Sequence, residues 1–256
     1  MELWTKEHAI TLLPSLAVMV LIGWLLRKLL GKKEERVRLI PVQVLTCVLL
    51  LLEVGKQALS FRQGYDLYHI PLHFCSLFLY VLPFFAFYRG KHRQAVTAIS
   101  AGICGSLFLL MLIYPNLIYG AWNIRDFFKG YFDFHTVAFH NIVMLVFVLI
   151  IALDLHVPEQ KGGWKPCALF AAAFCVVSAS MAQILETNYA NFYRCNIPPL
   201  EAVRAKVQEL AGYVPAQCLY VLIVSLLTVG FVIMCYQIYR GIYRLISRQK
   251  QPAEQR

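Results

Sequence analysis

The chain has 256 residues, of which 59% are hydrophobic and only 15% are charged. A water-soluble domain of this length could not bury so much apolar surface, so lipid must be its solvent. The composition therefore excludes a soluble enzyme. It predicts an all-α, polytopic membrane bundle that forms a single integral membrane domain over residues 1–256.

Seven apolar segments are each about 20 residues long, which is enough to cross a hydrocarbon core of roughly 30 Å. The first is too long for the core of a signal peptide, and basic residues from Arg27 onward follow it in place of a cleavage site. We therefore expect it to remain as a helix. In chain order, the transmembrane helices are expected near residues 10–30, 40–59, 70–88, 95–114, 136–155, 166–185 and 215–238.

The basic residues alternate between the two sides of this expected bundle. Sixteen of the 24 lysines and arginines lie in alternate connections: 27–38, 89–93, 161–165 and the tail from Arg240. The positive-inside rule places the richer set in the cytoplasm. This predicts an external N-terminus and a cytoplasmic C-terminus. Contact with lipid headgroups explains the net charge of +10 without a nucleic-acid partner.

The eight cysteines do not indicate a disulfide scaffold or a metal centre. Seven of them fall inside expected helices, and only Cys195 lies clearly in a loop. The sequence has no CxxC pair, and the cysteines are not spaced as metal ligands. Most should therefore be small buried apolar residues, and we expect no metal and no cofactor.

Polar side chains inside a bilayer are costly, so their depth is informative. Nearly all the strongly polar ones lie within two turns of the expected outer surface, whereas the inner half holds mainly single serines and threonines. One outward-opening polar pocket is the simplest interpretation. Its candidate residues include Glu53, His69, His73, Ser76, His135, His140, Asn141, Asn188 and Tyr189.

The segment His69-Ile-Pro-Leu-His73-Phe-Cys75-Ser76 is the densest part of this set. On an α-helix, His69, His73 and Ser76 would share one stripe about 60° wide, and Cys75 would point roughly 160° away from His73. His140 should reach nearly the same depth as His73 from a later helix. Two imidazoles at one level can share a proton, bind a metal or act as a general base.

Glu53 allows two interpretations. With Lys56 and Gln57 it forms i to i+3 and i to i+4 pairs near a helix end, which can simply neutralise themselves. Alternatively, Glu53 lines the polar site.

Several of these motifs together resemble a known family. The motifs are His69 to Ser76, Phe134-His135, Phe139-His140-Asn141, Thr187-Asn188-Tyr189 and Pro198-Pro199. The chain resembles the bacterial YwaF-like integral membrane proteins. These are similar to the transmembrane protein 164 acyltransferases and, more distantly, to the androgen-induced family of lipid hydrolases. The resemblance covers the second to seventh helices and implies a bacterial plasma-membrane protein.

The resemblance implies acyl chemistry on lipids within the membrane. Carried over, His140 would be the base, and the nucleophile would come from residues 72–76. Leu72 stands where the animal pattern has a cysteine, so Cys75 or Ser76 would have to take that role.

The leading hypothesis is a lipid acyltransferase or lipid-ester hydrolase acting on a membrane phospholipid or another lipid ester. Cys75 or Ser76 would attack the ester, and His140 or His73 would take the proton. Asn141 or Asn188 would stabilise the oxyanion. The remaining expected substrate contacts are His69, Glu53, His135 and Tyr189.

The alternative is a proton-coupled small-molecule transporter in which His73, His140 and Glu53 form a relay. A receptor or scaffold would leave the clustered histidines unexplained. The sequence does not indicate an oligomeric state.

Overall fold

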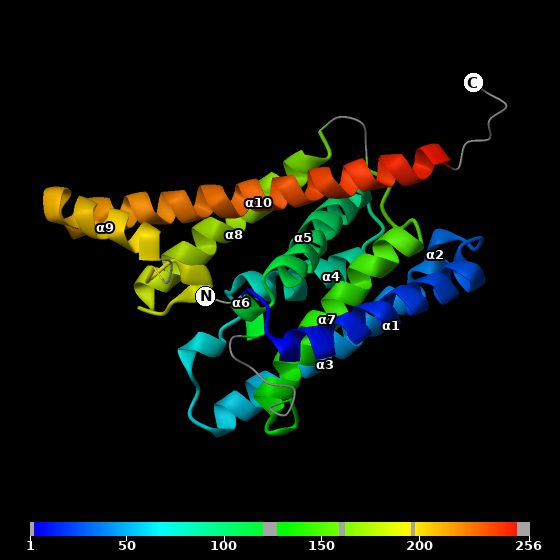
Figure 1. The fold of residues 1–256 in the computed structure, drawn as a ribbon, viewed down its shortest axis with the longest axis horizontal. Coiled ribbons are helices and arrows are strands. Elements are labelled where there is room, and N and C mark those ends of the chain that lie inside the picture. The colour runs from blue at the N-terminus through cyan, green and yellow to red at the C-terminus, as the bar shows by residue number, and fades with distance from the viewer. Residues whose placement is uncertain (1–2, 120–126, 159–161, 196–197, 250–256) are drawn as a thin grey trace.

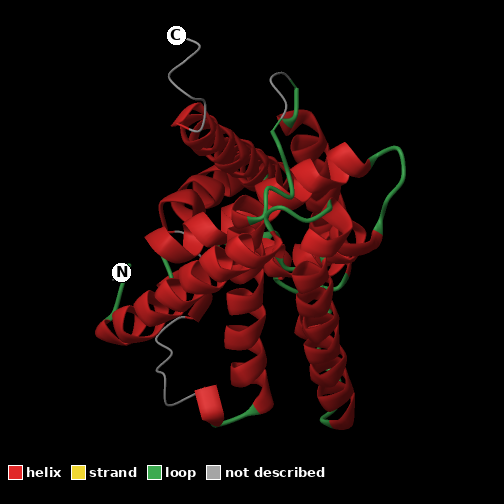
Figure 2. Ribbon diagram, turned by 90° about the vertical axis from the view of Figure 1, so that its right-hand side faces the viewer, coloured by secondary structure: helices red, strands yellow, loops and turns green. Residues whose placement is uncertain are grey.

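The computed structural model describes residues 3–119, 127–158, 162–195 and 198–249. Within these residues the elements are helices joined by loops and turns (Figure 2). The longer helices are α1 (Lys6–Leu30), α3 (Ile40–Arg62), α4 (Leu77–Phe87), α5 (Arg93–Ile113), α7 (Tyr131–Ala152), α8 (Trp164–Ile184), α9 (Pro198–Ala211) and α10 (Tyr213–Gln249). The shorter elements are α2 (Glu35–Arg38), α6 (Asn116–Tyr119) and the 3₁₀ turns η1 (Leu67–His69), η2 (Phe74–Ser76) and η4 (Tyr189–Asn191).

The prediction of a multi-pass helical membrane protein is confirmed. In the described part of the chain, 6 helices are long and apolar enough to cross a membrane: α1, α3 with α2, α5, α7, α8 and α10. The expected span at 70–88 is shorter than predicted. Its helix α4 has 11 residues, and even with the preceding turn the apolar helix runs only from Phe74 to Phe87.

Helix α5 lies at the centre of the bundle (Figure 1). It packs against α4, α7, α8 and α10, while α1 and α3 pack on the far side of α7. Small residues on α5 allow this close approach, as is common in membrane helices. A Cβ atom added at Gly102, for example, would lie 3.0 Å from Cys167 Sγ of α8.

The segment before α4 is not an α-helix, so the predicted single stripe of His69, His73 and Ser76 is wrong. Pro71 has no backbone N–H and forces the residue before it out of the helical region. Accordingly, Ile70 has a ψ of 131°, outside the helical region. His73, two residues after the proline, is extended as well, with a ψ of 159°. The chain therefore makes two 3₁₀ turns separated by extended residues, and the Asp66 side chain accepts a hydrogen bond from Tyr68 N at the first turn.

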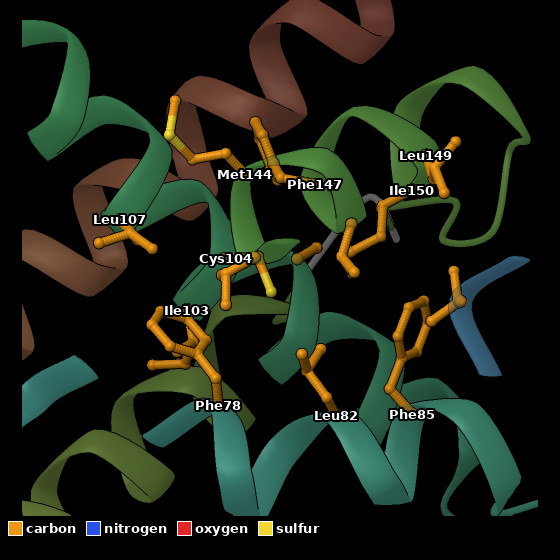
Figure 3. Close-up of a cluster of buried hydrophobic side chains, with 14 of the residues drawn as sticks. Phe78, Leu82, Phe85, Ile103, Cys104, Leu107, Met144, Phe147, Leu149 and Ile150 are labelled. Carbon is orange, nitrogen blue, oxygen red and sulfur yellow. The ribbon is translucent and has the colours of Figure 1, made fainter. Parts of the chain in front are cut away.

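A layer of apolar side chains fills the middle of the bundle (Figure 3). Helix α4 contributes Phe78, Leu82 and Phe85, and these side chains are fully buried. They meet residues of α5 and α7, including Ile103, Leu107, Met144 and Phe147. This layer separates the polar groups at one end of the bundle from those at the other.

A buried polar cluster lies at the end of the bundle that carries the basic connections, where mainly single serines and threonines were expected. His156, just after α7, is 2% exposed. Thr97 Oγ1 donates to the Gln94 carbonyl and so accepts from His156 Nδ1, at 2.8 Å. His156 Nε2 then accepts from the Tyr236 hydroxyl, and Tyr239 donates to the His156 carbonyl. His156 thus joins α5 and α10 just beyond the end of α7.

This cluster makes the stability of the protein depend on pH. Burial, aided by the positive charge of Arg93, lowers the pKa of His156 from 6.5 to about 4. The unfolded chain therefore binds a proton more readily than the folded one. The resulting stabilisation is complete above pH 6.5 and should be lost as the pH falls towards 4.

We expect the unfolding temperature in detergent to fall over that pH window, and the fall should be smaller in His156→Phe. The matched control His92→Phe, at an exposed histidine, should keep the wild-type pH dependence. Parallel pH profiles for wild type and His156→Phe would show that His156 is not the group responsible.

Candidate active site

A cavity of about 420 Å³ lies between α3, α5, α7 and the turns that precede α4. Most of the polar residues singled out in the sequence line it, although they come from three separate segments of the chain. Its polar lining residues are Glu53, Lys56, Tyr68, His69, His73, Cys75, Ser76, His135, Thr136 and His140.

Glu53 is the centre of a hydrogen-bonded network on one wall of this cavity. Its carboxylate accepts from Lys56 Nζ at 2.8 Å, from Gln57 Nε2 at 2.7 Å and from His135 Nε2 at 3.1 Å. The side chains of Glu53 and Lys56 are only 11% and 15% exposed. Glu53 therefore pairs with Lys56 and also lines the cavity, so both interpretations of this carboxylate hold.

The same network holds the loop between α3 and α4 in place. Gln57 Nε2 also donates to the His69 carbonyl at 2.8 Å, and Tyr65 donates to Gln57 Oε1 at 2.9 Å. His69 Nδ1 lies 2.6 Å from Ser60 Oγ, and its ring stacks on Phe132 of α7 with 4.9 Å between centroids. His69 is thus held by α3 and α7 even though it lies outside an α-helix.

Backbone and carboxylate acceptors fix the tautomers of three histidines in the cavity. His73 Nε2 lies 3.0 Å from the Tyr68 carbonyl, and His140 Nδ1 faces the Thr136 carbonyl. A carbonyl oxygen only accepts, so in each case the other ring nitrogen carries the free lone pair. His135 donates through Nε2 to Glu53, which leaves its Nδ1 as the acceptor. All three imidazoles can therefore accept a proton.

Cys75 and Ser76 lie at the beginning of the apolar helix that runs from Phe74 to Phe87. His73 is extended and precedes the first turn, and Ser76 N closes that turn by donating to the His73 carbonyl at 2.9 Å. The first N–H groups of a helix lack partners within it and carry a partial positive charge. Both side chains line the cavity at this start of the helix.

Three of the expected site residues lie outside the cavity lining. Asn141 donates to the Val137 carbonyl and faces a different pocket, beside α1. The Asn188 side chain accepts from Tyr193 N and Arg194 N and so shapes its own loop. Tyr189 supports the cavity from behind, because its ring packs on His73 and its hydroxyl donates to the Leu67 carbonyl.

The rest of the cavity wall is apolar. Phe74, Leu107, Leu110, Ile118, Phe132 and Phe139 line it. Leu107 also belongs to the apolar layer of Figure 3, so this layer forms the floor of the cavity. Such a lining suits a hydrocarbon chain that is attached to a polar linkage.

The site predicted from the sequence lacks three of the polar residues that line the cavity, Lys56, Tyr68 and Thr136. The sequence indicated Lys56 only as the ion-pair partner of Glu53. Tyr68 lies in an expected loop, just before the helix predicted at residues 70–88. The signal for Lys56 was present, since a lysine within an apolar helix requires a partner or a function. Nothing in the sequence marks Tyr68, because its contact with His73 depends on the turn at Asp66.

Comparison with known proteins supports the family resemblance suggested by the motifs. No curated protein and no solved structure matches the chain. The TMEM164 family does match, over residues 3–236, which takes in α1 to α9 and most of α10. The resemblance to the transmembrane protein 164 family is thereby confirmed, and the chain belongs to the TMEM164 family.

Proposed function

We propose that the cavity between α3, α5 and α7 is the active site of a lipid acyltransferase that acts on phospholipids or other lipid esters. The observation that carries this proposal is the meeting of Cys75, three proton-accepting histidines and the Glu53 network in one apolar-walled cavity. A nucleophile, a base and room for an acyl chain are the parts that acyl transfer needs. Membership of the TMEM164 family supports the same chemistry.

In the first half of the proposed reaction, His140 Nε2 takes the proton of the Cys75 thiol, and the sulfur attacks the carbonyl carbon of a lipid ester. The carbonyl π electrons move to the oxygen, where Lys56 and the N–H groups at the start of the helix stabilise the negative charge. The ester C–O bond then breaks, and the departing oxygen takes the proton from His140. A lipid alcohol leaves, and the acyl group stays on Cys75 as a thioester.

In the second half, His140 takes a proton from the hydroxyl group of an acceptor lipid, whose oxygen attacks the thioester carbonyl. The C–S bond breaks, and the sulfur recovers the proton from His140. The acyl group has then moved from one oxygen to another without a net change in charge or oxidation state. With water in place of the acceptor, the same steps hydrolyse the ester.

The test of this proposal is turnover of a fluorescent phospholipid by purified protein in lipid vesicles. His140→Ala should slow it by roughly a hundredfold to ten-thousandfold, the usual contribution of a general base. The matched control His92→Ala, at an exposed histidine outside the cavity, should keep the wild-type rate. Equal turnover by wild type and His140→Ala would contradict the proposed base.

The proposed orientation places the N-terminus outside and the C-terminus in the cytoplasm, so that the cavity serves the outer leaflet. The bundle end opposite the cavity carries the basic connections, where Arg93 of α5 pairs with Glu35 and Arg27 of α1 with Asp154. A reporter fused after Arg256 should report cytoplasm, and one placed within residues 186–214 should report the exterior. The reverse pattern would move the active site to the inner leaflet.

The transporter alternative receives less support. A transport path needs polar groups along its whole length, whereas the floor of this cavity is the apolar layer that contains Leu82, Leu107 and Met144. The polar cluster around His156 lies beyond that layer, and the imidazole is bonded at both nitrogens.

A further inference from the structure

A second cavity, of about 590 Å³, lies between α8 and α10. It shares no lining residue with the candidate active site. We call it the α8–α10 groove. Its lining residues are Ala172, Cys175, Val176, Ala179, Ser180, Gln183, Gln217, Cys218, Val221, Leu222, Ser225, Leu226 and Val229.

The groove opens towards the surface that faces lipid. Small residues of α8 leave the space, among them Ala172, Cys175 and Ala179 at helical spacing. At its edges Leu222 is 54% exposed and Leu226 is 64% exposed. In a membrane-spanning helix, such apolar side chains lie against hydrocarbon, so a lipid chain can enter the groove from the side.

The length of the groove matches the thickness of one leaflet. Gln217 and Val229 mark its two ends along α10, and twelve residues of helix span about 18 Å. Half of a hydrocarbon core of roughly 30 Å is about 15 Å. One acyl chain can therefore lie along the groove with its polar end beside Gln217.

Gln217 provides a separate indication that a ligand binds here. Its side chain is 6% exposed, and its nitrogen faces the carbonyl oxygens of Phe192, at 3.1 Å, and Tyr193, at 3.3 Å. This contact fixes the orientation of the amide, since the reverse would place oxygen against oxygen. Oε1 is then buried, and among the described residues it has no hydrogen-bond donor.

A buried carbonyl oxygen without a donor is unfavourable, so a group from outside the chain should supply one. Phosphatidylcholine has no N–H or O–H group and cannot do so. We propose that the α8–α10 groove binds a glyceride with a free hydroxyl group. Its acyl chain lies along α8 and α10, and its hydroxyl donates to Gln217 Oε1. This site is separate from the active site, and binding there does not require turnover.

The test uses a diacylglycerol with a photoreactive diazirine in its acyl chain, added to the protein in phosphatidylcholine nanodiscs. Cross-linked peptides should come from α8 and from residues 217–229 of α10. Leu222→Trp, at the mouth of the groove, should reduce this labelling several-fold. The matched control Leu227→Trp should not, because Leu227 is 61% exposed on the same helix but does not line the groove.

The hydrogen bond is tested with the methyl ether of the same probe, which cannot donate. In wild type the ether should label the protein roughly two- to tenfold less than the alcohol, because it lacks the contribution of one hydrogen bond to binding. In Gln217→Met the two probes should label equally, a comparison that also controls for any loosening of the loop at Phe192.

Three results would overturn the proposal: equal labelling by alcohol and ether in wild type, labelling that Leu222→Trp leaves unchanged, or cross-links from the groove to a second copy of the chain in place of lipid.

Discussion

Replacing Cys75 by alanine should reduce phospholipid turnover by roughly a thousandfold or more, because the reaction loses the atom that carries the acyl group. The thiol lines the cavity at the first turn of the helix from Phe74 to Phe87. Cys75→Ser should keep only a small fraction of the activity, since a hydroxyl group ionises much less readily. Turnover of a fluorescent phospholipid in vesicles measures both effects.

Ser76→Ala is the decisive comparison, since Ser76 lines the same cavity one residue later. It should keep most of the activity, as should Cys47→Ala at an exposed cysteine of α3. If Cys75→Ala stays active while Ser76→Ala does not, the serine is the nucleophile and the thiol assignment is wrong. If both variants stay active, this helix does not supply a covalent nucleophile.

Glu53→Leu should destabilise the protein by about 3–5 kcal/mol, because it leaves the Lys56 ammonium nearly buried without its carboxylate. The substitution also removes the acceptor of Gln57 and His135. Adding Lys56→Met should recover much of the loss, because an unpaired buried charge is the main penalty. Chemical unfolding in detergent micelles gives the free energy of unfolding for each variant.

An ion pair on the surface provides the control for these two substitutions. Lys206 and Glu209 of α9 lie 3.0 Å apart, but their side chains are 70% and 68% exposed. Glu209→Leu should therefore change the free energy of unfolding by less than about 1 kcal/mol. A similarly small effect for Glu53→Leu would mean that the network around Glu53 does not hold the cavity wall together.

The apolar segments predicted most of the fold, because a helix that crosses lipid needs a long apolar stretch and little else. The exception was residues 70–88, where the apolar composition extends upstream into residues around Pro71 that are not α-helical. Hydrophobicity alone does not separate a helix from the extended residues before it. The proline in this segment is the sequence feature that marks the change, because it disfavours a helical conformation at Ile70.

The sequence predicted which residues would lie near the site, but it did not predict their hydrogen-bond partners. The depths of His73, His135 and His140 follow from the spans, and the structure places all three at one cavity. Their hydrogen-bond partners are backbone carbonyls and Glu53, which depend on tertiary packing. The role of His156 was not predicted, because its partners come from two helices, α5 and α10, that are distant from it in sequence.

The measurement that tests the acyltransferase most directly is the mass of the protein itself during turnover. Purified protein in vesicles is mixed with a phospholipid of known acyl composition, stopped with acid within seconds and analysed by intact and peptide mass spectrometry. We predict a mass increase equal to one acyl group, located on Cys75, removed by hydroxylamine and absent in Cys75→Ala. Turnover without any adduct at Cys75, or an adduct that stays on Ser76 in Cys75→Ala, would contradict the account.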